Sequence, residues 1–363
     1  MASTPSQGRL RRAILGLPIL AAAAAMIHVF LQALPVTTPF MDKVTAAGRY
    51  EHNGIDVPLR STFYGVAALD QLFSVISMAM FQLYSFADPV AYWQSLTFLV
   101  EFTAMYAIML FESCRGSAKG TIFAYPFITA FAAQLASLGI MGPIYFYALH
   151  VCIPLSRLAP RDARRIDPSY AAVVLPAVVA GYTIPHLLSY LHPDLEARHW
   201  WNWIWQPYPM WCSALLLATA AACSILSPPR NHIVSVRIAV AVIALLNAAV
   251  FRYTKAASGM TTFAIFFPKH FIEIPPDMDT VFRTLLQYDW LCGFGASLLW
   301  LAHQLAALKS ARLTSVSWPA MLLAGLTTYA VSGVGNVLLL GWWFREEVLV
   351  SWNSDSSPSK KKL

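Results

Sequence analysis

Four acidic side chains lie inside apolar stretches of the sequence, and these residues are the ones whose chemistry stands out. They are Asp70, Glu101, Glu112 and Asp289. A charge inside a membrane-spanning segment is costly, so an acid there indicates function by default. An acid in an apolar cavity tends to remain protonated, and it can then deliver a proton where no water competes. The pattern favours general acid catalysis in a desolvated site.

The four acids differ in what their neighbours predict. Glu112 is followed by Arg115 three residues later, a spacing that favours a local ion pair. Asp289 is the first choice for the proton donor, with Asp70 at a comparable depth and Glu101 deeper, as a partner or cation stabiliser. We expect these three to face one cavity. The alternative for each is a hydrogen bond that holds two helices together.

Aromatic residues are the second chemical feature, because ring faces attract cations and an aromatic cavity could stabilise a carbocation. Tyrosines and tryptophans recur through the apolar stretches, most densely in 145–147. The competing interpretation is that the rings pack in the core or face lipid. The residues expected to contact substrate are Tyr64, Glu112, Tyr145, Tyr147, Tyr288 and Trp290.

Residues that would bind a metal do not cluster in the sequence. A diphosphate-dependent terpene enzyme needs dense aspartates to hold Mg²⁺, and Asp277-Met278-Asp279 is only a pair in a loop. The nine histidines are scattered, and the five cysteines show no metal-ligand spacing. The sequence therefore predicts no metal site and no cofactor.

The composition places these residues in a membrane. Of 363 residues, 58% are hydrophobic and only 12% are charged, against about 25% in soluble domains. The net charge of +7 comes from Lys and Arg in short loops and tails without interleaved aromatics, so we expect membrane lipid and no nucleic acid as partner. The oligomeric state is left open.

The apolar stretches predict an all-α, polytopic bundle of eight or nine spans. The candidates are 13–34, 63–85, 91–112, 121–154, 168–191, 208–227, 234–252, 284–308 and 317–343. We expect one transmembrane domain over 13–343, a basic tail over 1–12 and a polar tail over 344–363. The segments 35–62 and 253–283 should be loops outside the membrane.

Two of these candidates are irregular. The segment 121–154 is too long for one upright span and too short for two, so Gly139, Gly142 and Pro143 should kink it. The ninth contains Gly325 and Gly333 and could be broken. No internal repeat is visible, which weakens a transporter hypothesis.

The orientation depends on the number of crossings. A cytosolic N-terminus suits the positive-inside rule, but nine spans then put the C-terminus in the lumen. The chain ends in Lys360-Lys361-Lys362-Leu363, which resembles a dilysine signal for the endoplasmic reticulum that works only from the cytosol. Both hold only if the number of spans is even.

The sequence resembles the fungal integral membrane terpene cyclases of meroterpenoid biosynthesis, closest to the ascofuranone, ascochlorin and macrophorin type. The segments that carry the resemblance are Tyr64-Gly65 with Leu69-Asp70-Gln71, Phe111–Arg115, Trp205-Gln206-Pro207-Tyr208-Pro209 and Gln287–Gly295. The resemblance implies a non-redox cyclase. It would protonate an epoxide or terminal olefin on a farnesylated aromatic substrate and cyclise the prenyl chain without metal.

Other functions stay open at this point. A different membrane isomerase, similar to a sterol isomerase or an indole-diterpene cyclase, would use the same acids on another lipophilic substrate. A proton-coupled transporter would use them as relays. The sequence does not decide the substrate, the product or which acid is the donor.

Overall fold

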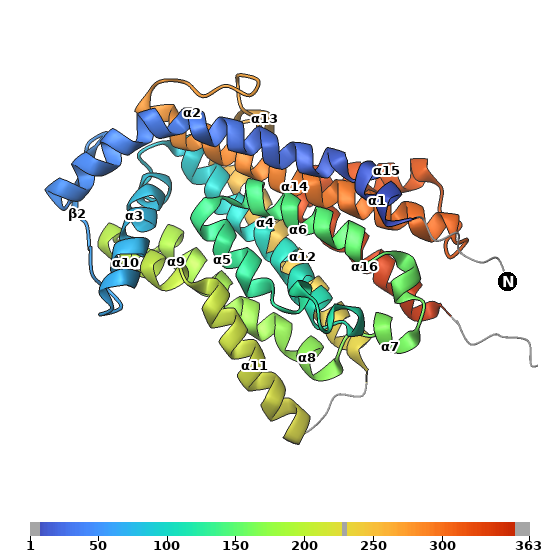
Figure 1. Ribbon diagram of the computed structural model, residues 1–363. Helices are drawn as coiled ribbons and strands as arrows, with labels where there is room; N and C mark the ends of the chain where they lie inside the picture. Colours follow the sequence, from blue (N-terminus) through green and yellow to red (C-terminus); the bar gives the residue numbers. More distant parts are fainter. Residues whose placement is uncertain (1–7, 227–230, 353–363) are drawn as a thin grey trace, which may run out of the picture.

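Long apolar helices form most of the molecule, as this computed structural model of residues 8–226 and 231–352 shows (Figure 1). The expected all-α bundle is confirmed. Six helical stretches among the described residues are long and apolar enough to cross a membrane, rather than eight or nine. They are α2 (Leu17–Ala47), α4 (Pro89–Ser113), α8 (Pro168–Val178) continued by the π-helical turn Val179–Thr183 and α9 (Ile184–Leu191), α11 (Tyr208–Leu226), α12 (His232–Ala257) and α14 (Met278–Ser310).

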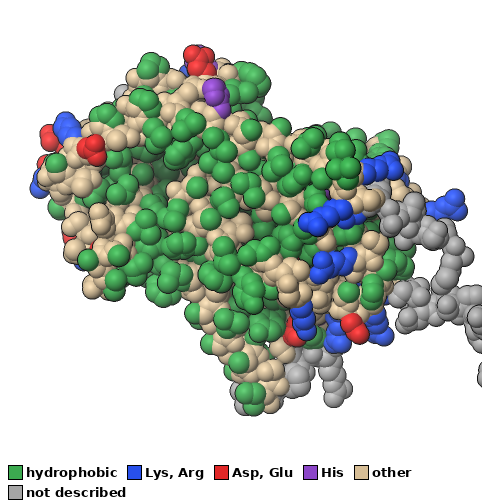
Figure 2. Space-filling view, in the orientation of Figure 1, with side chains coloured by type: hydrophobic (Ala, Val, Ile, Leu, Met, Phe, Trp, Pro, Cys, Tyr) green, Lys and Arg blue, Asp and Glu red, His purple; other side chains and the backbone are tan. Residues whose placement is uncertain are grey.

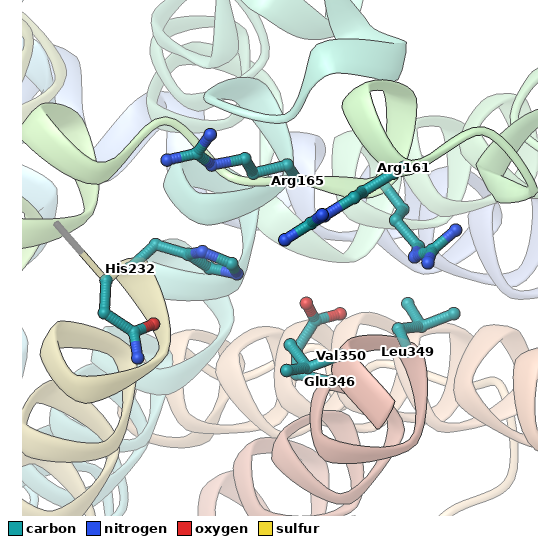
Figure 3. Close-up of a pocket in the computed structure, with 8 residues that line it drawn as sticks. Arg161, Arg165, His232, Glu346, Leu349 and Val350 are labelled. Atoms are coloured by element: carbon teal, nitrogen blue, oxygen red, sulfur yellow. The ribbon is translucent and has the colours of Figure 1, made fainter. Parts of the chain in front are cut away.

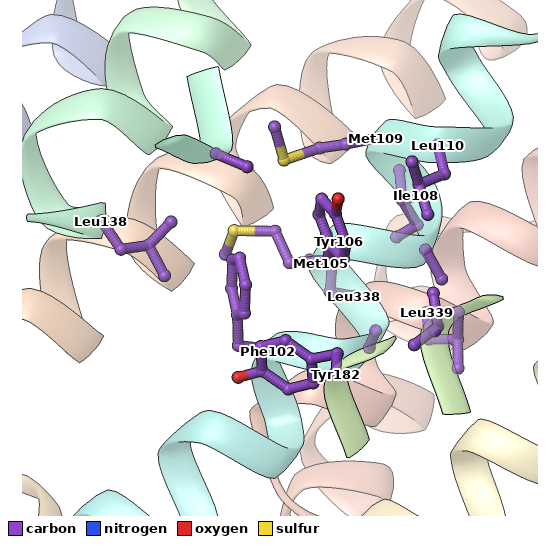
Figure 4. Close-up of a cluster of buried hydrophobic side chains, with 14 of the residues drawn as sticks. Phe102, Met105, Tyr106, Ile108, Met109, Leu110, Leu138, Tyr182, Leu338 and Leu339 are labelled. Atoms are coloured by element: carbon purple, nitrogen blue, oxygen red, sulfur yellow. The ribbon is translucent and has the colours of Figure 1, made fainter. Parts of the chain in front are cut away.

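Helix α4 lies at the centre of the bundle. Every residue from Ala91 to Glu112 is buried, as a helix that is apolar on all sides requires. Figure 4 shows part of this core, where Phe102 and Tyr106 of α4 lie near Tyr182 and Leu338 from two other parts of the chain. Helix α4 therefore holds its one central acid, Glu101, away from solvent and lipid.

The segment 121–154 forms a helical hairpin instead of one kinked span. Its two helices, α5 (Pro126–Ala136) and α6 (Leu138–Cys152), meet at Ser137, whose φ is 117°. The break is thus at Ser137, and the glycines and proline that we expected to cause it lie within α6. The chain enters and leaves at one end of the bundle, because the N–H of Gly116 donates to the carbonyl of Arg165 at 3.0 Å.

The segment 317–343 is a second hairpin of the same kind. Helices α15 (Trp318–Ser332) and α16 (Val334–Ser351) meet at Gly333, whose φ is 83°. Helix α16 returns to the end where α4 finishes, since Arg115 and Glu346 are joined there by an ion pair of 2.8 Å. The helical domain therefore extends to Ser351, and the polar tail that we expected from residue 344 begins later.

A cap covers the other end of the bundle. It consists of the outer part of α2, an antiparallel hairpin of β1 (Arg49–His52) and β2 (Ile55–Pro58), α3 (Ala67–Tyr84) and α10 (Leu195–Trp205). The segment 35–62 is therefore largely structured: Pro35 and Pro39 lie inside α2 and do not end it. Helix α3, expected as the second span, is not among the six candidate crossings.

The remaining elements are short. Helix α1 (Arg9–Leu15) precedes α2, and α13 (Thr262–Phe266) lies in the expected loop 253–283. Near the ends of α4 and α6 lie α7 (Arg161–Arg164) and the 3₁₀ turns Gly116–Ala118, Ile122–Ala124 and Leu155–Leu158.

Basic side chains gather at the end of the bundle opposite the cap, which we call the basic face (Figure 2). The guanidinium of Arg12 donates to the carbonyl of Val151 at 2.9 Å, and Arg164 donates to the carbonyl of Trp352. Both ends of the described chain therefore lie on this face. Six candidate crossings are an even number, which is the condition under which the positive-inside rule and a cytosolic C-terminus agree. The terminal lysines lie outside the described residues.

Candidate functional site

Asp289 lies on an apolar pocket of about 440 Å³ between the cap and the bundle. This volume is within the usual range for small-molecule sites. Asp289 stands near the middle of α14 and is half-buried. Other polar groups on the pocket include Gln134, Tyr208 and, on the outer part of α2, Asp42.

Six aromatic rings line the same pocket. They come from α2, α4, the end of α10, the start of α11 and α14, so parts of the chain that are distant in sequence meet around one space. The rings belong to Phe30, Phe98, Phe102, Trp205, Tyr208 and Phe282. Such a lining can bind a prenyl chain and can also attract a positive charge that develops on it.

The turn of the α5–α6 hairpin holds the Asp289 carboxyl group. Its Oδ1 accepts hydrogen bonds from the Ser137 hydroxyl at 2.6 Å and from the N–H of Gly139. These donors stand at the N-terminus of α6, whose backbone dipole favours negative charge. A Cβ on Gly139 would stand 3.0 Å from Oδ1, so the close approach leaves little room for a side chain at this position. Among the described residues Oδ2 has no hydrogen-bond partner, which leaves it available to a ligand.

Glu101 makes the equivalent contact with the α15–α16 hairpin. Its Oε1 accepts from the N–H of Gly335 at 3.3 Å, at the N-terminus of α16. Its Oε2 accepts from the indole N–H of Trp290 at 2.9 Å. A Cβ on Gly333 would stand 1.9 Å from Oε1, so no space remains there for a ligand.

The two acid sites are arranged as a swapped structural repeat. In each half a long helix with a central acid is followed by a hairpin: α4 with α5–α6, and α14 with α15–α16. Each acid caps the hairpin of the other half, because Asp289 of α14 binds α6 and Glu101 of α4 binds α16. Trp290, next to Asp289, links the two sites. The repeat that we could not see in the sequence is present in the structure.

The three acids expected on one cavity do not converge. Among them only Asp289 lines the pocket; Glu101 does not, although its neighbours Phe98 and Phe102 do. Asp70 stands at the start of α3, where its Oδ1 accepts from the backbone N–H groups of Phe63 and Tyr64 at 2.9 and 2.7 Å. These bonds, from Tyr64 foremost, hold the pKa of Asp70 below its usual value. Asp70 therefore stabilises the turn that precedes α3, by binding two of its backbone N–H groups.

None of the six residues expected to contact substrate lines the pocket. The Tyr64 hydroxyl donates to the carbonyl of Trp203 at 2.5 Å, and the Tyr288 hydroxyl donates to the carbonyl of His270 at 2.5 Å. Tyr145 is buried beside Phe146, and Tyr147 packs against the start of α2. Trp290 touches Glu101, as described above. We did not predict Ser137, Gly139, Gln134 or Tyr208, although Tyr208 belongs to a segment that carries the resemblance.

Glu112 belongs to a buried network at the basic face. The expected ion pair with Arg115 is present at 2.8 Å. Arg345 pairs with Glu112 at 2.8 Å and with Glu346 at 2.7 Å, and Trp342 donates to Glu112. Two arginines and two glutamates balance their charges while all four are at most 2% exposed. This geometry favours a structural role for Glu112.

Comparison with known proteins places the chain in a family. The model of the CtvD domain matches residues 11–231 and 231–350. The chain belongs to the CtvD family. It is 25% identical, over 99% of its length and 46% of the relative's, to a protein of Penicillium polonicum named FAD-dependent monooxygenase verC1. It is also 25% identical to FAD-dependent monooxygenase anuJ of Penicillium roqueforti, over 94% of this chain and 41% of that one. No solved structure matches the chain.

The CtvD-family chain spans less than half the length of these curated relatives. The activity in their names belongs to the whole relatives and is not assigned to the part that matches this chain. Dinucleotide cofactors such as FAD are commonly held by a glycine-rich turn between a strand and a helix. The strands among residues 8–226 and 231–352 form only the β1–β2 hairpin, and Gly293-Phe294-Gly295 lies inside α14. The described residues thus offer no cradle of that kind. They also contain no group of three His, Cys, Asp or Glu placed to hold a metal ion.

Proposed function

We propose that this membrane protein is a non-redox terpene cyclase in which Asp289 protonates a lipophilic, prenylated substrate. The observation that carries the proposal is the placement of the Asp289 carboxyl group, held by the turn of the α5–α6 hairpin, on an apolar, aromatic-lined pocket of about 440 Å³. The proposed substrate is a farnesylated aromatic compound, and the proposed location is the endoplasmic reticulum.

In the proposed reaction Asp289 donates its proton from Oδ2 to the oxygen of an epoxide on the prenyl chain. The C–O bond breaks, the oxygen becomes a hydroxyl group, and a neighbouring double bond attacks the electron-poor carbon to form a ring. The final cation loses a proton. In this proposal Ser137 and Gly139 stabilise the carboxylate that remains on Asp289, and the aromatic rings of the pocket attract the cation.

Among the two starting groups that the sequence left open, we favour the epoxide over the terminal olefin. The relatives are about twice as long and are named FAD-dependent monooxygenases. Flavin monooxygenation of an alkene yields an epoxide, which is the group that the Asp289 site would open. An epoxide also needs a weaker acid than an olefin does, because its oxygen already carries lone pairs.

The proposal is tested in microsomes that contain the full chain and receive a farnesylated phenol with a terminal epoxide. Asp289→Asn keeps the shape of the side chain but removes its acidic proton. We expect cyclised product, measured by liquid chromatography and mass spectrometry, to fall about 10²–10⁴-fold. Glu51→Gln, on the exposed edge of β1, is the control and should keep the wild-type rate. EDTA should not reduce the rate.

Cyclisation by Asp289→Asn at the wild-type rate would contradict the assignment of Asp289. Loss of activity with EDTA that Mg²⁺ restores would contradict the metal-free reaction. Asp289→Glu, which retains an acid, distinguishes lost chemistry from lost folding, since it should keep part of the activity if Asp289→Asn fails only chemically.

One observation favours a second candidate, a proton-coupled transporter. Structural repeats with half-helices that end at mid-membrane are typical of transporters, and the swapped hairpins have this form. Uptake of the substrate into sealed vesicles without chemical change would support that function. Cyclised product in detergent solution, where no gradient exists, would support the cyclase.

A further inference from the structure

A second pocket, of about 400 Å³, lies on the basic face and is separate from the Asp289 site. It is bounded by α7, the start of α12 and the end of α16. Its lining residues are Arg161, Arg164, Arg165, Asn231, His232, Glu346, Leu349 and Val350. Figure 3 shows the basic groups and the Glu346 carboxylate around one open space.

The positive charge of this pocket is not neutralised by its own acid. Glu346 is the one carboxylate that lines it, and that carboxylate is paired with Arg115 at 2.8 Å and with Arg345 at 2.7 Å. Arg161 and Arg165 are exposed, and no ion pair with either is found among the described residues. The space therefore presents a net positive potential.

Several contacts of Arg164 hold the floor of the pocket. Arg164 is buried and donates to the carbonyl of Ala159 at 2.6 Å, and its guanidinium lies 5.2 Å from the centre of the Trp352 ring. The carbonyl of Arg164 accepts from Arg115 at 2.5 Å. A preformed pocket with guanidinium groups at its rim suits a phosphate group, which arginine binds with fixed geometry.

The position of the pocket identifies the source of that phosphate. Helices α8 and α12 begin at this end of the bundle and α4 ends there, so the pocket lies beside the ends of three candidate membrane-spanning helices, where lipid headgroups are expected. Two of its lining side chains, Leu349 and Val350, are apolar. Basic pockets between helices at the cytoplasmic face are typical binding sites for anionic headgroups. We propose that this pocket binds the phosphate of an anionic membrane lipid.

The test uses the purified full-length protein in nanodiscs or mild detergent. Bound phosphatidic acid and phosphatidylcholine are measured by native mass spectrometry for the wild type and for Arg161→Gln/Arg165→Gln. Arg164 is left intact because it holds the backbone. The control is Arg11→Gln/Arg157→Gln, which removes the same charge from exposed positions on the basic face but outside the pocket.

We expect the pocket variant to bind phosphatidic acid at least about 10-fold more weakly than the wild type, because it loses charge-assisted hydrogen bonds to the phosphate that the control positions do not make. The control variant and the binding of phosphatidylcholine should change little. Equal loss in both variants would overturn the proposal, because it would show a diffuse effect of surface charge.

Titration with inorganic phosphate, followed by calorimetry, distinguishes a lipid headgroup from a soluble phosphate as the ligand. If the pocket variant loses phosphate binding while its binding of phosphatidic acid is unchanged, the site serves a soluble phosphate and the lipid assignment is wrong. Arg165→Gln alone is the second variant if the double substitution lowers the thermal stability. If the two arginines contribute equally, the fold-loss of affinity for phosphatidic acid in this single variant should be about the square root of the fold-loss in the double variant.

Discussion

The contact between Ser137 and Asp289 shows how the acid is positioned at the residue scale. Ser137→Ala removes one of two donors to Oδ1 and leaves the N–H of Gly139. A hydrogen bond to a charged group contributes about 1.5–3 kcal/mol, so we expect kcat for cyclisation to fall about 10- to 100-fold. KM should be unchanged because Ser137 acts on the carboxylate that forms during the reaction. A change in KM alone would contradict this role.

A second residue-scale prediction concerns His199, which joins three parts of the cap. Its Nε2 accepts from the N–H of Arg60 at 3.0 Å, and its Nδ1 lies 2.8 Å from the Tyr84 hydroxyl. Burial lowers the pKa of His199 to about 4. The unfolded chain binds the proton near pH 6.5, so the free energy of unfolding should fall as the pH drops from about 6.5 to 4, by up to about 3 kcal/mol.

Hydrogen exchange of residues 60–84 at pH 7 and pH 4.5 measures this effect. His270→Gln, at an exposed position, is the control and should respond to pH as the wild type does. His199→Gln should reduce the difference between the two pH values. The rates are compared as protection factors, which correct for the intrinsic exchange rate at each pH. Equal protection factors at the two pH values in the wild type would contradict the prediction.

Sequence reasoning selected Asp289, which lines the pocket, but it did not predict the groups that hold the Asp289 carboxyl group. An acid in an apolar stretch is visible in the sequence because its burial is costly. Ser137 is 152 residues away, and nothing in its own neighbourhood shows which helix its turn will meet. Asp70 and Glu101 were expected at the pocket because the sequence predicts how far along a helix a residue lies. It does not predict which side of the helix faces the pocket.

At the scale of elements, the two hairpins depend on their turns. Gly333 has a φ of 83°, and a Cβ there would stand 1.9 Å from the Glu101 carboxylate. We expect Gly333→Ala to lower the free energy of unfolding by at least about 1–3 kcal/mol, the cost of such a conformation for an L residue.

The measurement is thermal unfolding in detergent, and Gly325→Ala is the matched control in the same hairpin. A Cβ on Gly325 would meet only Val337 at 3.6 Å, and alanine favours the helix by about 1 kcal/mol. The control should therefore be as stable as the wild type or more so. Equal stability of Gly333→Ala and wild type would contradict the role of the turn.

The hairpins also show why element counts from hydropathy were too high. An apolar stretch of suitable length is consistent with one crossing and equally with two short helices that enter and return. Gly333 marks the second turn in the sequence, but Ser137, with a φ of 117°, carries no such signal. Helix α2 is longer than the sequence predicted. Pro35 and Pro39 are residues that usually end a helix, but both lie inside α2, which packs against α6 and α14.

At the scale of the whole molecule, the six candidate crossings go with both ends of the described chain lying on the basic face. The positive-inside rule assigns that face to the cytosol. In sealed microsomes, added protease should remove tags from both termini and should spare a tag inserted at Asn53-Gly54 in the β1–β2 turn. A protected C-terminal tag would show an odd number of crossings.

The exchange of hairpins between the two halves has a consequence for the origin of the chain. The second half, residues 231–352, contains Asp289, which binds the start of α6 in the first half. The acid that binds its own α16 is Glu101, which belongs to the first half. Two copies of one half could satisfy both contacts only by pairing head to head with each other. The arrangement resembles a domain-swapped homodimer whose two halves are contained in one polypeptide. Two halves of a single chain need not be alike, and here Asp289 lines an open pocket while Glu101 lies against a glycine turn.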